Sequence, residues 1–228
     1  MKIDFRGDVR DFLQINPWFA GLPDAVQAAL VDAGRRTVLA KGQWLYAEGD
    51  ASSGLSAVLT GALRIAVSVG RERDVLFDIA GPGAILGHPV GLAGRPRLST
   101  ARAGARSQVF AVPYAQVQTI GEAHPTLTRA LDELYHYQVG YILLVAAGAL
   151  SLAPRGRVAG RLLLMTQNRL DQTDFVPVTQ TDLAEMTGLS RKSVHGHLQA
   201  LARMRIVEVV YGGVRILDQA RLLALAER

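Results

Sequence analysis

Cysteine is absent from the 228 residues of the chain. This absence excludes disulfide bonds, thiolate zinc sites, cysteine-ligated iron–sulfur clusters and cysteine nucleophiles. No apolar run approaches the length of about 18 residues that a membrane-spanning helix needs. The N-terminal residues mix acidic and basic side chains without an apolar stretch, so we expect no secretory signal. Together these absences predict a cytoplasmic protein without membrane contact.

Signals of catalysis and of metal binding are missing as well. The sequence contains no Gly-x-Ser-x-Gly, P-loop or dinucleotide-binding fingerprint. A metal-binding jelly roll needs clustered histidines and carboxylates, yet residues 35–112 hold one histidine, His88. His195 and His197 are two apart on a predicted helix and point roughly 200° apart, which prevents them from chelating one ion. We therefore expect no catalytic residues, no metal site and no enzyme.

The composition is that of a globular protein, with 49% hydrophobic and 20% charged residues. The formal net charge is +5, and its distribution is uneven. Residues 153–228 carry 11 basic and 7 acidic side chains, whereas residues 1–152 carry 14 and 13. The basic excess therefore lies in the last third of the chain, where it favours a polyanionic partner.

Residues 35–112 have the pattern of an all-β region. Short alternating apolar runs are separated by glycines, and 11 of the 23 glycines of the chain fall here. Glycine provides the positive φ angles of tight turns, and strands repeated at this spacing predict a roll, sandwich or barrel. A short helix over residues 22–33 precedes it.

Residues 124–152 change to a heptad period. Positions spaced alternately by four and three residues form a seam, which comprises Leu127, Leu131, Leu134, Gln138, Tyr141, Val145, Gly148 and Leu152. Such a seam packs against a second helix, and a polar residue such as Gln138 within it fixes the register between two copies. We predict a parallel dimerisation helix. The alternative is a long helix packed on its own β domain.

The last third has the pattern of a winged helix. Thr179 and Asp182 form a near capping box for one short helix, and Gly188 provides a turn. Ser190 caps a second helix that is amphipathic through Val194, Leu198 and Leu201, as in a helix-turn-helix. Two β-branched runs over 206–211 and 214–216 flank a Gly-Gly pair, which predicts a hairpin with a two-residue turn.

At these residues the chain resembles the CRP/FNR family of bacterial transcription regulators. The resemblance is carried by residues 49–50, 59–61, 70–72 and 83–103, and most specifically by 179–184 and 190–194. It implies an α+β fold with a β-roll sensor domain (1–123), a dimerisation helix (124–153) and a winged helix-turn-helix domain (154–228). The implied partners are a second copy of the chain, double-stranded DNA with an inverted-repeat operator, and RNA polymerase.

In this family the segments 83–92 and 95–100 wrap a cyclic nucleotide. Arg97 matches the arginine that holds the cyclic phosphate, a contact suited to its planar fork. The alternative is a surface or salt-bridged arginine without a ligand. The glutamate for the ribose is replaced by His88, and the serine for the phosphate by Leu98. The tentative effector pocket comprises Gly87, His88, Arg97, Leu98, Ile142 and Leu143, the last two of which stand where nucleotide-binding members offer hydroxyls. Each lost polar partner weakens binding by about 1–3 kcal/mol, so we expect no ordinary response to cyclic AMP.

The second helix of the motif is expected to lie in the major groove and to present Arg191, Lys192 and His195 to base edges. We assign Thr179, Gln180 and Ser190 to phosphates, because helix N-termini attract anions. Many family members have glutamate at the position of Lys192 and arginine at that of Gly196. Glutamate accepts from cytosine whereas lysine donates to guanine, so the operator is predicted to differ from the common half-site.

The identity of the cofactor or effector stays open. One alternative keeps the fold but senses haem or another small molecule, with His88 or His124 as the haem ligand. Another is a regulator that has no effector and is controlled by its own abundance. The apolar side chains of Leu98, Ile142 and Leu143 are compatible with that reading and with an apolar ligand.

Overall fold

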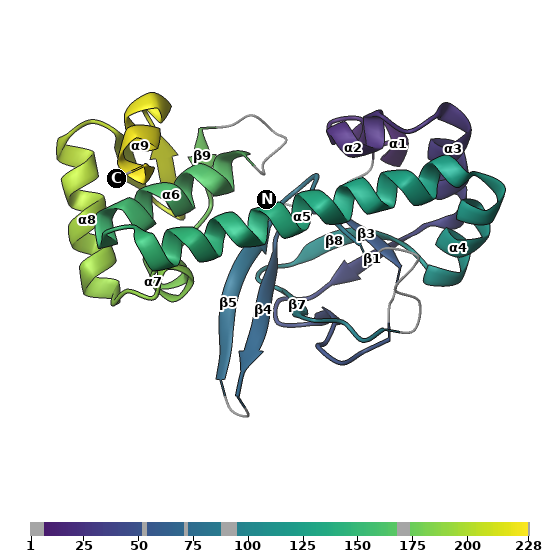
Figure 1. Ribbon diagram of the computed structural model, residues 1–228, viewed down its shortest axis with the longest axis horizontal. Coiled ribbons are helices and arrows are strands. Elements are labelled where there is room, and N and C mark those ends of the chain that lie inside the picture. The colour runs from purple at the N-terminus through teal and green to yellow at the C-terminus, as the bar shows by residue number, and fades with distance from the viewer. Residues whose placement is uncertain (1–6, 52–53, 71–72, 88–94, 168–173, 228) are drawn as a thin grey trace. The chain divides into compact units, whose positions relative to one another are not determined.

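The computed structural model describes residues 7–51, 54–70, 73–87, 95–167 and 174–227 (Figure 1). These residues form two compact units. The first runs to Val139 except for Val75–Phe77, which belong with Gly140 and the following residues to the second.

The first unit begins with short helices, α1 (Val9–Leu13), α2 (Pro17–Ala20) and α3 (Asp24–Ala33). Two of them start at local capping signals. The side chain of Asp8 accepts hydrogen bonds from the first-turn amides of α1, and that of Asn16 does the same for α2. Pro17 occupies the first position of α2, where the missing N–H is not needed.

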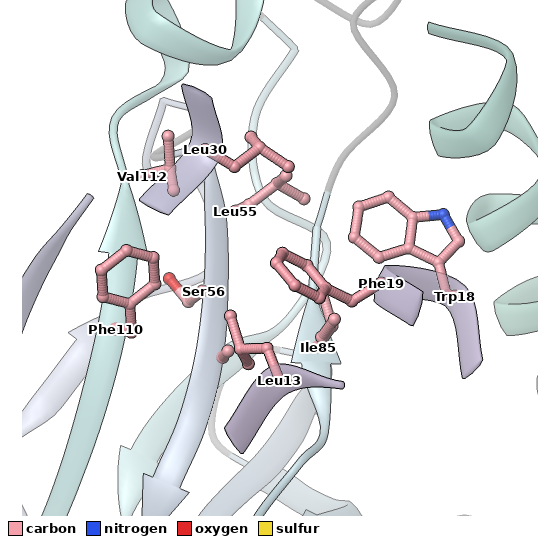
Figure 2. A pocket seen from close by; sticks show the side chains of 10 residues that line it. Leu13, Trp18, Phe19, Leu30, Leu55, Ser56, Ile85, Phe110 and Val112 are labelled. Carbon is pink, nitrogen blue, oxygen red and sulfur yellow. The ribbon is translucent and has the colours of Figure 1, made fainter. Parts of the chain in front are cut away.

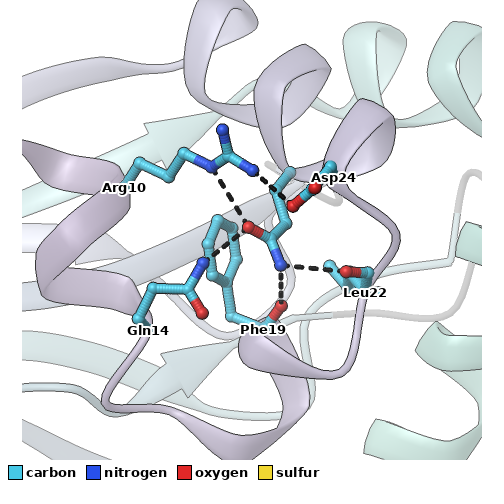
Figure 3. A network of polar contacts seen from close by, with 6 residues as sticks. Arg10, Gln14, Phe19, Leu22 and Asp24 are labelled. Atoms are coloured by element: carbon cyan, nitrogen blue, oxygen red, sulfur yellow. Dashed lines mark hydrogen bonds and ion pairs between the residues drawn. The ribbon is translucent and has the colours of Figure 1, made fainter.

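Gln27 of α3 ties these helices together through hydrogen bonds to four residues. Figure 3 shows these partners, which are Arg10, Gln14, Phe19 and Leu22. The Gln27 side chain is 2% exposed. The amide Nε2 donates to the carbonyl oxygens of Phe19 at 3.2 Å and Leu22 at 2.9 Å. Its Oε1 accepts from Arg10 Nε at 3.1 Å and from Gln14 Nε2 at 2.6 Å. A buried amide is stable here because its donors and acceptor all find partners.

Replacing Gln27 by methionine is therefore expected to lower the free energy of unfolding by about 2 kcal/mol or more. Methionine fills a similar volume but leaves the polar groups around it unpaired, at about 1–3 kcal/mol for each that stays buried. Denaturant unfolding measures the change. Gln116, which is exposed on α4, gives the control, since Gln116→Met should change stability by less than about 0.5 kcal/mol. Equal effects of the two substitutions would contradict the role of Gln27.

The strands of the first unit pair in the orders β1-β8-β3-β6 and β2-β7-β4-β5. Their bounds are β1 (Arg35–Leu39), β2 (Trp44–Tyr46), β3 (Leu55–Thr60), β4 (Leu63–Val69), β5 (Arg73–Ala80), β6 (Ile85–Leu86), β7 (Thr100–Ala103) and β8 (Ser107–Val112). β3 lies between β8 and β6, and residues 55–59 are buried. Successive side chains of a strand point to opposite faces of its sheet, so both faces of β3 are covered. This explains why β3 has a nearly continuous apolar sequence rather than strict alternation.

Helix α4 (Tyr114–Ala123) follows β8, and α5 (Pro125–Ser151) is the long teal helix of Figure 1. Leu127 and Leu131 of α5 belong to the core cluster of the first unit, together with Phe19 of α2 and Leu55 of β3. Trp18 Nε1 also donates to the carbonyl oxygen of Ala130 at 2.6 Å. The N-terminal part of α5 is thus an integral part of the first unit.

The second unit contains α6 (Pro154–Gln167), β9 (Phe175–Val176), α7 (Gln180–Thr187), α8 (Arg191–Arg203), β10 (Val207–Val210), β11 (Gly213–Ile216) and α9 (Gln219–Ala226). The strands form an antiparallel sheet in the order β10-β11-β9. Fully buried side chains on its helices and strands make its core, among them Val158, Leu162, Leu183, Leu198 and Leu222. Strand β9 was not expected from the sequence, because two residues carry no period.

The hairpin turn lies one residue earlier than the sequence predicted. The turn residues are Tyr211 and Gly212, and Gly213 opens β11 by pairing with Val210. Gly212 has the positive φ of 80°. Gly213 is needed for close packing instead, because a Cβ there would lie 2.5 Å from the ring of Phe175. The predicted Gly-Gly turn was therefore wrong. Gly212 provides the positive φ of the turn, whereas Gly213 is a strand residue that allows close packing.

None of the helices in the described part of the chain is long and apolar enough to cross a membrane. Within the same residues, no group of three or more histidine, aspartate and glutamate side chains is placed to hold a metal ion.

Candidate DNA-binding interface and effector pocket

Helix α7 begins at a complete capping box. The N-cap Thr179 accepts from the amide of Asp182 at 3.0 Å, and the Asp182 carboxylate accepts from the Thr179 amide at 3.3 Å. The Thr179 hydroxyl also donates to Asp182 Oδ2 at 2.8 Å. Its hydroxyl hydrogen is therefore directed to Asp182, and Thr179 positions α7 in the present geometry.

The turn between α7 and α8 is formed by Gly188 and Ser190. Gly188 ends α7 with φ of 67° and ψ of 27°, the left-handed conformation that glycine adopts without a steric penalty. Ser190 caps α8 by accepting from the amide of Ser193 at 3.1 Å. On α8, Val194, Leu198 and Leu201 are each 0% exposed. These contacts fix both the direction of α8 and the face it presents to solvent.

The exposed face of α8 carries the side chains expected to read DNA. Arg191 and Lys192 begin the helix, His195 follows one turn later, and all are exposed. The first turn contains no acidic residue. Cations at a helix N-terminus oppose the helix dipole, at about 0.3–1 kcal/mol each. Arg191 and Lys192 thus do not stabilise α8 through its dipole. Their positive charges are instead suited to an anionic partner.

The structure connects two of the predicted DNA-binding residues. The Oε1 atom of Gln180, the first residue of α7, lies 3.3 Å from Nδ1 of His195 on α8. Gln180 was assigned to a phosphate, and this contact to His195 was not predicted from the sequence. A separation of 15 residues across a turn gives no periodic signal, so only the fold could reveal it.

The basic side chains beyond the motif differ in their surroundings. Arg215 of β11 pairs with Glu208 on the neighbouring strand β10, with 2.7 Å between Nη1 and Oε2. Arg203 and Arg205, near the end of α8, are exposed. Because the charge of Arg215 is offset by its neighbour, it is a weaker candidate for a phosphate contact than the other two.

In the first unit, Arg97 is built into the fold. Its side chain is buried, and its guanidinium carbon lies 4.2 Å from the centre of the Tyr46 ring. Nη2 donates to the carbonyl oxygen of Gly54 at 3.0 Å. The Arg97 backbone is fixed as well, since its amide donates to the Asp50 carbonyl at 2.8 Å and its carbonyl accepts from Gly49 at 2.9 Å. Arg97 therefore contributes to the packing of its own unit without any ligand.

Burial shifts the pKa values of Arg97 and Tyr46 in opposite directions. It lowers the pKa of Arg97, an effect that the nearby Tyr46 and Asp50 oppose. Burial also raises the pKa of Tyr46, while Arg97 and a hydrogen bond with Ser99 act in the opposite direction. The tyrosine is neutral at physiological pH, so the stack is a cation–π contact rather than an ion pair.

The other residues of the tentative effector pocket show little sign of a polar ligand site. Leu98 is 70% exposed on the first unit, and Gly87 packs so closely that a Cβ there would lie 2.4 Å from Leu55. Ile142 and Leu143 are exposed residues of the second unit. His88 lies outside the described residues.

Part of the predicted seam of α5 is buried within its own unit. Leu127 and Leu131 are 0% and 2% exposed inside their own unit, and Leu134 packs against the same cluster. Gln138 Nε2 donates to the Ile85 carbonyl of that unit at 3.4 Å. The seam therefore covers its own β domain at these positions, which was the alternative reading. Heptad spacing defines a stripe on a helix but does not determine what covers it.

Two later residues of the seam are also partly buried or in contact with other side chains of the chain. Tyr141 meets Phe77 edge to face, with 6.2 Å between ring centres, and Val145 is half-buried. A different set of α5 side chains is exposed, comprising Tyr135, Tyr137, Ile142, Leu143, Leu144 and Leu150. Of these, Tyr135, Ile142 and Leu150 lie within ~80° of one another around the axis, at about 100° per residue. We call these three residues the outer stripe of α5.

Comparison with known proteins agrees with this architecture. A model of the cyclic nucleotide-binding domain matches residues 36–124. A model of the Crp-like helix-turn-helix domain matches residues 156–225. The chain belongs to the CRP/FNR family of bacterial transcription regulators. The predicted fold of β-roll, long helix and winged helix-turn-helix is confirmed, and the family is one of DNA-binding regulators rather than enzymes.

The chain is similar to individual members of the CRP/FNR family. The nitrogen fixation regulation protein FixK of Bradyrhizobium diazoefficiens is 26% identical over 200 residues, which cover 85% of this chain and 82% of FixK. The structure of FixK2 from Bradyrhizobium japonicum has a TM-score of 0.74 at 18% identity, and the match covers 84% and 96% of the two chains. The c-di-GMP responsive regulator CLP of Xanthomonas campestris has a TM-score of 0.66 at 15% identity, over 85% and 99%. These structures support the fold.

An apolar cavity in the cyclic nucleotide-binding-like domain is shown in Figure 2. It is lined mainly by apolar side chains of helices and strands, including Leu13, Phe19, Leu55, Ile85 and Phe110. Its volume is about 20 Å³, which is close to the space that one water molecule requires. It is too small to hold a nucleotide or haem in the present geometry.

Proposed function

We propose that this CRP/FNR protein is a homodimer that binds an inverted-repeat operator through α8 in successive major grooves. The observation that carries the proposal is the exposed row of Arg191, Lys192 and His195 on a helix whose opposite face is fully buried. Base edges in the major groove present acceptors and amino groups that these side chains recognise. Two copies related by a two-fold axis require two half-sites about one helical turn apart. Such a protein acts on chromosomal DNA in the cytoplasm.

The proposed interface between copies is the outer stripe of α5. Tyr135, Ile142 and Leu150 are exposed by 38%, 48% and 88% in the single chain. Apolar side chains at about heptad spacing are removed from water when two such helices pair. The outer stripe replaces the seam through Leu127 and Leu131, because those two side chains are already buried.

A purified full-length chain and a library of random duplexes test this function directly. Selection with and without cyclic nucleotides reports the operator and any ligand requirement together. We expect an inverted repeat whose half-site differs from the common family half-site at the bases facing Lys192 and Gly196. If the selection enriches no sequence, sequence-specific DNA binding is contradicted. If it returns the common family half-site at full affinity, the assignment of Lys192 to a base is contradicted.

The structure also supports an effector other than cyclic AMP, or none. Arg97 is engaged with Tyr46 and Gly54, and Leu98 has no group that donates to a phosphate. Haem sensing would depend on His88, outside the described residues, or on half-buried His124 at the end of α4; a visible absorption spectrum of the purified protein tests it. Contact with RNA polymerase stays a prediction from the family resemblance.

We expect 1 mM cyclic AMP to leave the thermal unfolding midpoint of the protein unchanged. A ligand with a Kd of about 1 μM would add about 4 kcal/mol of stability at this concentration, which a melting curve detects easily. The missing polar partners predict no such binding. A nucleotide-dependent rise in the midpoint that disappears in Arg97→Met would show that Arg97 leaves Tyr46 to hold the phosphate, and would contradict the proposal.

A further inference from the structure

We propose that Gln180 is a positioning residue that sets which groups His195 recognises on a base. The inference deepens the proposed function and rests on it. Its starting point is the distance of 3.3 Å between Gln180 Oε1 and His195 Nδ1. We assign Oε1 of Gln180 as the acceptor of this contact, which places the hydrogen of the neutral ring on Nδ1. The other ring nitrogen, Nε2, then carries a lone pair and accepts.

Both partners are attached to rigid parts of the helix-turn-helix. Gln180 directly follows Thr179, whose capping box with Asp182 fixes the start of α7. His195 follows Val194, which is fully buried, and stands one turn after Arg191 on α8. Positions i and i+4 lie on the same side of a helix. His195 is therefore on the side of α8 that carries Arg191, and its ring orientation is set from α7.

An accepting Nε2 discriminates between bases in the major groove. Cytosine offers its N4 amino group there and adenine its N6 amino group, whereas guanine and thymine face Nε2 with acceptors. An unrestrained histidine exchanges its tautomers and tolerates both kinds of edge. The pair with Gln180 thus predicts a preference for cytosine or adenine of about fivefold per half-site, the size expected for one hydrogen bond. The side-chain NH2 group of Gln180 keeps its two hydrogens as donors, which is compatible with the predicted phosphate contact.

The experiment is competition binding at pH 8 to operators that differ at one position in each half-site. That position is the one whose preference disappears in His195→Ala. Gln180→Met has the length of glutamine but no acceptor, and should reduce the preference there to less than about twofold while other positions keep theirs. Gln180→Asn, whose shorter side chain does not reach Nδ1, should do the same. Gln116→Met, at an exposed site on α4 outside the helix-turn-helix, is the control and should keep the full preference.

The double variant Gln180→Met/His195→Ala separates positioning from a structural role. If Gln180 acts through His195, the double variant behaves at this position like His195→Ala alone. A purely structural role would instead lower affinity for all operators and shift the unfolding midpoint. The proposal is overturned if Gln180→Met and Gln180→Asn keep the wild-type preference, or if His195→Ala changes no position. Failure of the wild-type protein to select any sequence would refute the proposed function itself and is recognisable as such.

Discussion

Replacing Arg191 by alanine is expected to weaken binding to the selected operator by roughly 30-fold to 10⁴-fold. A bidentate pair between arginine and guanine contributes about 1–3 kcal/mol, and a dimer contains two copies of it. Arg191 is the first residue of α8 and is exposed, so its removal leaves no cavity. Fluorescence anisotropy with the operator and with a scrambled duplex measures the change, which should be much smaller for the scrambled sequence.

The same substitution is expected to raise the stability of the protein slightly. A positive charge at a helix N-terminus opposes the dipole, so its loss should add about 0.3–1 kcal/mol to the free energy of unfolding. Arg203, at the other end of α8, gives the control: Arg203→Ala should lower stability by a similar amount and weaken operator binding only a few-fold. If Arg191→Ala destabilises the protein and leaves operator affinity intact, Arg191 is structural and the assignment is wrong.

The helix-turn-helix could be predicted from the sequence because its signals are local. Thr179 and Asp182 form their capping box within one helical turn, and Gly188 and Ser190 act on the residues next to them. Such interactions depend little on the rest of the fold. The β-roll was predictable for a similar reason, since glycine turns and alternating runs repeat along the chain.

The surroundings of other site residues depend on contacts between distant segments, which the sequence does not reveal. Leu127 was assigned to a partner, but its environment is determined by strands and helices far away in sequence, such as Leu55 and Phe19. For Arg97 the sequence left a ligand contact and a role without a ligand open, and the structure stacks its guanidinium on Tyr46. A heptad pattern or a family motif identifies a residue that needs a partner. Which partner it finds is decided by the tertiary fold.

The proposed interface between two copies, the outer stripe of α5, leads to the second large effect. Ile142→Lys is expected to convert the dimer into a monomer and to lower operator affinity by about 10²–10⁴-fold. Two lysines would face each other across the two-fold axis in an apolar interface, where an unpaired charge is strongly unfavourable. A monomer then binds each half-site separately and loses the effective concentration that links them. Lysine does not repel phosphates, so reduced affinity reports the loss of pairing.

Leu144→Lys is the matched control on the same helix. Leu144 is 61% exposed, comparable with 48% for Ile142, but two residues along a helix place it roughly 200° around the axis, on another face. We expect Leu144→Lys to remain dimeric and to bind the operator with nearly wild-type affinity. Sedimentation velocity gives the oligomeric state and anisotropy the affinity. If Leu144→Lys breaks the dimer while Ile142→Lys does not, the outer stripe is not the interface, and the opposite face of α5 pairs the two copies.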